Sequence, residues 1–195
     1  MSEATSAPFI EIKNVSKAYG PTIANDNVSF EVLRGSVHAV LSENGAGKST
    51  TMKLLSGLIR PDSGKILIDG REVSLKSPRD AHAVGIQTAF QELTLIPDLS
   101  VLDNMLIPKS ATNALSMLKR SEAVRAVSDH FNQLGLVVDL DAEVGDLDLA
   151  TRQKIEIARV LYRNPQTLLL DEPTSALTGE DVDWLGQVIA DAKAR

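Results

Sequence analysis

The chain has 195 residues, and its 20 Lys and Arg against 26 Asp and Glu residues give a formal net charge of −6. With 43% hydrophobic and 24% charged residues, the composition is that of a globular domain and excludes wholesale disorder. The negative balance argues against nucleic-acid binding through bulk positive charge. Because there is no cysteine, disulfides, thiolate zinc sites and cysteine nucleophiles are excluded. No signal peptide is expected, and no apolar run approaches the roughly 18 residues that span a bilayer.

In the first half, short apolar or alternating segments bounded by turns predict strands. Ser77-Pro78 has the pattern of a helix N-cap followed by proline at the first helical position. A Gly-containing loop precedes a helix that carries Leu54, Leu55 and Leu58. The predicted strands are Val28–Val32, Val37–Leu41, Ile66–Ile68 and Ile86–Phe90.

In the second half, helical signals dominate between about residues 92 and 150. Ser100-x-x-Asp103 is typical of a capping box. The sequence then predicts a helix over Thr151–Tyr162, a strand over Leu168–Leu170 and a last helix from near Thr178. The alternation of strands and helices predicts an α/β fold with a mainly parallel sheet, a small antiparallel β portion at the N-terminus and a helical insertion. We expect a disordered tail over residues 1–8 and a domain over 9–195, with a helical subdomain over about 92–150.

The segment Ser42 to Thr50 carries the strongest chemical signal. It reads Ser-Glu-Asn-Gly-Ala-Gly-Lys-Ser-Thr and links a predicted strand to a predicted helix. Backbone N–H groups in such a loop form an anion nest, and the helix N-terminus adds positive partial charge. Lys48 is expected to reach the β- and γ-phosphates of a nucleotide, and the Ser49 hydroxyl to bind Mg²⁺. The first glycine of the G-x-x-x-x-G-K-[ST] pattern is Ser42 here, which weakens binding rather than abolishing it.

Two carboxylates follow the apolar strand Leu168–Leu170. Asp171 and Glu172 stand at the end of the strand where open α/β sheets place their ligands. We expect Asp171 to hold Mg²⁺, directly or through water, and Glu172 to orient or deprotonate an attacking water. An ordinary acidic loop is the alternative, and the phosphate-binding pattern upstream weighs against it.

With these motifs, the chain from Phe9 onward resembles the ATP-binding subunit of ABC transporters. The resemblance implies that Tyr19 stacks on adenine and that Gln91 senses Mg²⁺ and the attacking water. It implies ATP contacts over the loop and helix start, and Mg²⁺ contacts from Ser49, Gln91 and Asp171. The implied nucleotide-binding residues are Tyr19, Ser42, Asn44, Gly45, Ala46, Gly47, Lys48, Ser49 and Thr50.

Two further runs, Phe90–Pro97 and Gln153–Arg159, are similar to those of monosaccharide importers of the ribose, xylose and galactose type. The resemblance implies the first of two tandem ATPase domains, at the cytoplasmic face of the inner membrane. The implied partners are membrane permease subunits, the second ATPase domain and, indirectly, a periplasmic sugar-binding protein; no nucleic acid is expected. Segment Ser175–Thr178 matches the family loop that crosses between paired ATPase domains.

The chain departs from the family at its signature, L-S-G-G-Q, which falls on Leu147–Thr151. Only the leucine matches, and Asp148 replaces a serine that contacts the γ-phosphate held by the opposite domain. Asp148 is also a good N-cap for the helix that follows it. We expect the acid to cap its own helix and to impair the nucleotide site that this signature completes.

The family's γ-phosphate histidine has no counterpart, because all three histidines precede Asp171. We therefore expect an incomplete ATPase domain that lacks at least one strand beyond Arg195. Two other functions stay open: a soluble ABC-type ATPase outside transport, and a catalytically impaired nucleotide-binding fragment.

Overall fold

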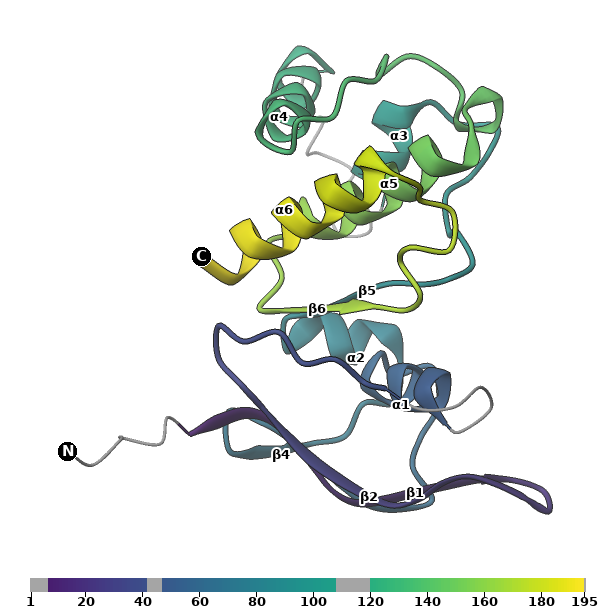
Figure 1. The fold of residues 1–195 in the computed structure, drawn as a ribbon, viewed down its shortest axis with the longest axis vertical. Helices are drawn as coiled ribbons and strands as arrows, with labels where there is room; N and C mark the ends of the chain where they lie inside the picture. The colour runs from purple at the N-terminus through teal and green to yellow at the C-terminus, as the bar shows by residue number, and fades with distance from the viewer. Residues whose placement is uncertain (1–6, 42–46, 108–119, 195) are drawn as a thin grey trace. The chain divides into compact units, whose positions relative to one another are not determined.

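The computed structural model describes residues 7–41, 47–107 and 120–194, and these divide into two compact units. The first unit comprises residues 1–86 and 189–195, and the second comprises residues 87–188. Figure 1 shows the elements of both units along the chain. Across the described residues, no helix has the length and apolar character that crossing a membrane requires.

The first unit is built on a four-stranded antiparallel sheet in the order β2-β1-β3-β4. Its central strand β1 buries Phe9, Ile10, Ile12 and Val15. Helix α1 begins at Lys48, near the end of the segment Ser42 to Thr50 that is called the phosphate-loop segment below. Helix α2 is capped by the Ser77 side chain, as predicted. The elements are β1 (Pro8–Tyr19), β2 (Thr22–Leu33), α1 (Lys48–Leu55), β3 (Ser63–Ile68), β4 (Arg71–Val73) and α2 (Pro78–Ala83).

Helices form most of the second unit, and a two-stranded sheet pairs β5 with β6. Its hydrophobic core joins α3, α4 and α5 through Val101, Leu102, Val127, Phe131 and Ile155. The capping box predicted at Ser100 starts α3, where the Ser100 hydroxyl accepts the Asp103 N–H at 3.0 Å. The elements are β5 (Ile86–Ala89), α3 (Val101–Leu106), α4 (Arg120–Gln133), a short 3-10 helix (Val144–Asp146), α5 (Leu149–Leu161), β6 (Thr167–Leu170) and α6 (Glu180–Ala194).

Three sequence predictions are wrong in detail. Val37–Leu41 forms no strand. The antiparallel β portion expected at the N-terminus is confirmed, but among the described residues it is the larger sheet, so the strands are not mainly parallel. Helix α1 ends at Leu55, so Leu58 lies beyond it. Gly57 explains this end, because its φ is +73° and an added Cβ would lie 2.3 Å from the Ser77 carbonyl oxygen. Of the expected disordered tail, residues 1–6 lie outside the described residues, and Pro8 already begins β1.

Candidate functional site

Gly47 fixes the junction between the phosphate-loop segment and α1. Its φ of +91° lies in the left-handed region, and an added Cβ would come within 2.3 Å of the Ala24 carbonyl oxygen on β2. Both the backbone conformation and the lack of space therefore require glycine at this position. Four predicted nucleotide-binding residues of the same loop lie outside the described residues: Ser42, Asn44, Gly45 and Ala46.

The N-terminus of α1 suits an anion. The helix begins at Lys48, so Lys48, Ser49 and Thr50 are its first three residues, as the sequence predicts. Its N-cap is Gly47, which has no side chain to hold the first N–H groups, and its first turn contains no acidic residue. A helix N-terminus of this kind attracts negative charge through its N–H groups and its dipole. The residues present thus fit a phosphate group, with the Ser49 hydroxyl available as an oxygen ligand for Mg²⁺.

Asn25 supports this junction from β2, and no sequence motif identified it. Its side-chain amide donates to the Thr51 hydroxyl at 2.9 Å, and that hydroxyl donates to the Gly47 carbonyl at 3.2 Å. Asn25 is buried, and within the described part of the chain no donor reaches its Oδ1 atom. Asn25, Gly47, Lys48 and Thr51 line one hollow of the first unit.

Tyr19 is the other predicted nucleotide-binding residue of the first unit. It ends β1, pairs with Thr22 across the β1–β2 turn and is half exposed. The Lys17 ammonium lies 5.9 Å from the centre of its ring. An exposed aromatic face at a strand end can stack on a flat ligand, which leaves the role of Tyr19 a prediction.

Gln91, Asp171 and Glu172 belong to the second unit and follow neighbouring strands. β5 ends at Ala89, β6 ends at Leu170, and the Asp171 N–H donates to the Ala89 carbonyl at 3.1 Å. This bond brings the chain that leads into Gln91 beside the start of the acidic pair. Asp171 is buried, whereas Glu172 and Gln91 are exposed. The described residues contain no cluster of three His, Cys, Asp or Glu side chains that could bind a metal ion.

Glu172 has a strained backbone. Its φ is +48°, in the left-handed region that costs a residue with a Cβ roughly 1–2 kcal/mol. Strain of this kind persists where the surrounding structure imposes it, and it concentrates at functional sites. The sequence pattern predicted a functional carboxylate here, but nothing in the pattern indicated the strain.

Asp148 caps α5, as the sequence predicts. Its carboxylate accepts the Thr151 hydroxyl at 2.7 Å and the Thr151 N–H at 2.9 Å. These two hydrogen bonds, the one from the hydroxyl first, hold the pKa of Asp148 below its ordinary value of 3.8. The acid is therefore ionised at neutral pH, and its own oxygens occupy the N-terminus of α5.

Comparisons with known proteins identify the family of the chain. The family model described as ABC transporter matches residues 25–175. The chain is 41% identical over 188 residues to the ribose import ATP-binding protein of Rhodococcus jostii, covering 96% of this chain and 37% of that protein. It is 39% identical over 186 residues to an arabinose import ATP-binding protein of Burkholderia ambifaria, covering 95% and 37%. The chain thus spans little more than a third of these relatives.

Solved structures show the same fold. A nucleotide-free ATP-binding cassette from an ABC transporter superposes with a TM-score of 0.84 at 25% identity, over 96% of this chain and 78% of that one. A dimeric cassette bound to ADP and phosphate superposes with a TM-score of 0.82 at 25% identity, over 94% and 82%. These matches confirm the α/β ATPase fold predicted from the motifs.

Proposed function

Because the chain belongs to the ABC transporter family, we propose that it binds Mg-ATP and, paired with a second ATPase domain, hydrolyses it to drive sugar import. The curated relatives described above are import ATP-binding proteins for ribose and arabinose, which favours transport over a soluble ATPase outside transport. The sugar is a monosaccharide in this proposal, and its selection belongs to the permease and to a periplasmic sugar-binding protein. The chain would act as a peripheral subunit at the cytoplasmic face of the inner membrane.

One observation carries the nucleotide-binding part of the proposal: α1 opens at Lys48 behind a glycine that no other residue can replace. With glycine as its N-cap and no acid in its first turn, this helix N-terminus complements phosphate charge. In the proposed complex, Lys48 contacts the β- and γ-phosphates, and the rest of the loop from Ser42 to Thr50 surrounds them. Tyr19 stacks on the adenine ring.

The remaining residues serve hydrolysis in this proposal. Ser49, Gln91 and Asp171 hold Mg²⁺, which when bound neutralises charge on the phosphates. Glu172 accepts a hydrogen bond from the attacking water and orients it toward the γ-phosphate. Gln91 bonds to the same water.

A second candidate function is nucleotide binding without hydrolysis at one of the paired sites. Asp148 favours it, because the resemblance in sequence aligns this acid with the serine whose hydroxyl donates to the γ-phosphate in the family. Single-turnover hydrolysis, measured site by site, separates this candidate from an ATPase with two active sites.

Calorimetric titration with Mg-ATP tests the binding proposal. We expect Lys48→Ala to weaken binding at least tenfold, or about 1.4 kcal/mol. Lys53→Ala is the matched control, because Lys53 is an exposed lysine in the last turn of the same helix. Equal affinities in the wild type and in Lys48→Ala would exclude the phosphate-binding role of this loop.

Gly47→Ala tests the geometry of the same junction. The added methyl group would meet the Ala24 carbonyl oxygen, so we expect a loss of Mg-ATP affinity of at least tenfold. Gly70→Ala is the control, since Gly70 also has a positive φ, +71°, but has open space around it. A loss of affinity that is the same in both variants would mean that general strain, rather than the shape of the loop, weakens binding.

A further inference from the structure

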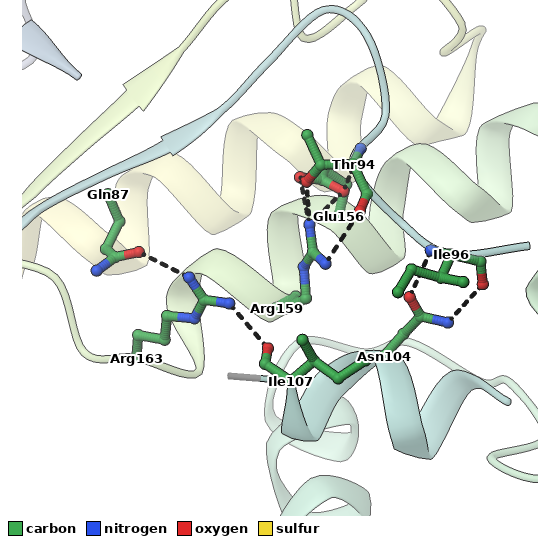
Figure 2. Close-up of polar contacts among 8 residues, drawn as sticks. All are labelled: Gln87, Thr94, Ile96, Asn104, Ile107, Glu156, Arg159 and Arg163. Atoms are coloured by element: carbon green, nitrogen blue, oxygen red, sulfur yellow. Dashed lines mark hydrogen bonds and ion pairs between the residues drawn. The ribbon is translucent and has the colours of Figure 1, made fainter. Parts of the chain in front are cut away.

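A charged pair lies buried on α5. Glu156 and Arg159 are one helical turn apart, and their side chains are 1% and 9% exposed. The Arg159 guanidinium donates to both carboxylate oxygens of Glu156, at 2.7 and 2.8 Å (Figure 2). Burying such a pair gives a fold little net stability, because the loss of hydration offsets the attraction. The pair therefore calls for an explanation other than holding the helix in place.

Both members of the pair bind a single residue, Thr94, which follows Gln91 by three positions. Glu156 accepts the Thr94 hydroxyl at 2.8 Å and the Thr94 N–H at 3.2 Å. Arg159 donates to the Thr94 hydroxyl and, at 3.5 Å, to its carbonyl oxygen. Thr94 lies in a segment that is neither helix nor strand, yet its N–H, hydroxyl and carbonyl groups are all bonded to α5. The buried pair thus fixes the path of the chain at this point.

The turn that follows α5 also holds the chain on the other side of Gln91. Arg163, one turn beyond Arg159, donates to the Gln87 side-chain oxygen on β5 at 3.2 Å (Figure 2). Gln91 therefore lies between two anchored points of the chain: Thr94 is bonded to α5, and Gln87 is bonded to Arg163 in the turn after α5.

Asn104 on α3 adds an anchor further along the segment. Its side-chain oxygen accepts the Ile96 N–H at 2.7 Å, and its amide donates to the Ile96 carbonyl at 2.9 Å. Asn104 is completely buried, so this anchor belongs to the core of the second unit. The segment after Gln91 is thus fixed at Thr94 and again at Ile96.

We propose that Thr94, Glu156 and Arg159 are positioning residues for Gln91, a role that rests on the function proposed above. Through Thr94, the buried pair sets where the Gln91 side chain stands relative to Mg²⁺ and the attacking water. Nucleotide binding itself depends on the loop at Lys48. Loss of the anchor should therefore slow hydrolysis and leave Mg-ATP affinity unchanged.

A pair of substitutions at Thr94 tests this in the complete paired protein, because the proposed hydrolysis requires a second ATPase domain. Thr94→Val keeps the shape of the side chain but removes the hydroxyl, whereas Thr94→Ser keeps the hydroxyl. With protein in excess over labelled Mg-ATP, we expect the single-turnover rate to fall about tenfold in Thr94→Val, since a misplacement of about 1 Å can cost about a hundredfold in rate and the remaining bonds to Thr94 limit the shift. Thr94→Ser should stay within about twofold of the wild type, and the dissociation constant of Mg-ATP should stay within about twofold in both variants.

Lys154→Met is the control on the same helix, because it breaks the ion pair of Lys154 with Asp181 (2.8 Å) without touching Thr94. Its rate should match the wild type. Equal rates in Thr94→Val and Thr94→Ser, or a parallel loss of affinity and rate in Thr94→Val, would overturn the positioning role and leave the proposed function intact. If the wild type binds no Mg-ATP, or hydrolyses it no faster than Lys48→Ala, both proposals fail.

Discussion

Asp148 and Thr151 form a closed cap at the start of α5, because the carboxylate of Asp148 accepts both the N–H and the hydroxyl of Thr151, at 2.9 and 2.7 Å. Helix α1 begins in the opposite way, with Gly47 as an N-cap that has no side chain. The N-terminus of α5 is thus capped by a side chain, whereas the N-cap residue of α1 has none to offer.

The cap should make stability depend on pH in acid. Hydrogen bonds from Thr151 lower the pKa of folded Asp148 below 3.8, so its contribution to stability is complete above that pH and is lost as the pH falls through the lowered pKa. Asn caps a helix about as well as Asp but does not titrate. We expect the stability advantage of the wild type over Asp148→Asn to shrink below about pH 4. Urea unfolding between pH 7 and pH 3 measures it.

Asp62 and Asp80 also have a lowered pKa. Both the wild type and Asp148→Asn contain these two groups, so their effect cancels in the difference between the two unfolding free energies. A difference in unfolding free energy that does not change with pH would contradict the assignment of the charged cap to Asp148.

Glu172 should show a trade-off between stability and activity. Glycine adopts a φ of +48° without strain, so Glu172→Gly removes roughly 1–2 kcal/mol of backbone strain from the folded state. The greater freedom of glycine in the unfolded chain offsets about 0.5–1 kcal/mol of this gain. We expect the unfolding free energy to rise by about 0.5–1 kcal/mol. Single-turnover hydrolysis should fall to the background measured with Lys48→Ala.

Glu172→Gln is the companion variant, because it keeps the strained backbone and removes only the charge. It should lose hydrolysis without gaining stability. If Glu172→Gly is no more stable than Glu172→Gln by chemical denaturation, the left-handed backbone at this position is not a source of strain.

Local signals in the sequence predicted the helix starts well. Ser77 and Ser100 begin α2 and α3 as expected, because an N-cap acts through contacts three residues away. The start of α1 at Lys48 was predicted for the same reason: a glycine loop followed by Lys and Ser specifies both a turn and a helix.

Strands that depend on distant partners were predicted less well. In β1, shifts in register between Ile12 and Val15 break the alternation of apolar and polar residues, and Asn14 has a φ of +52°. A search for apolar and polar residues that alternate along the chain therefore misses this strand. Val37–Leu41 has the opposite problem, since its composition favours a strand but no neighbouring strand pairs with it among the described residues.

The candidate site divides in the same way. Short motifs identified Lys48, Asp171 and Glu172, because the residues next to each of them in the sequence belong to the same recognisable pattern. The anchor of Thr94 on Glu156 joins residues 62 positions apart, and no local pattern reports such a contact. Asn25 was missed for the same reason, since its partner Thr51 lies 26 positions away.

Replacing the acid at the signature should restore the nucleotide site that this signature completes in a paired ATPase. Two unit charges about 4 Å apart repel by about 4 kcal/mol at an effective dielectric constant near 20, which exceeds the 1–3 kcal/mol of a lost hydrogen bond. Serine caps a helix nearly as well as aspartate, so Asp148→Ser should change stability by less than about 0.5 kcal/mol. We expect Asp148→Ser with Ala150→Gly to raise both occupancy and turnover at that site.

The measurement is nucleotide occupancy and turnover at one site of the paired protein, with the other site disabled by a Lys→Ala change in its own phosphate loop. Asp146→Ser is the charge-matched control, because Asp146 is an exposed acid two residues away that does not cap α5. The site that contains Lys48, Asp171 and Glu172 should be nearly unchanged, since its signature comes from the partner domain. If the double substitution leaves the affected site as weak as Asp146→Ser does, then Asp148 does not face a phosphate, and the N-cap is its whole role.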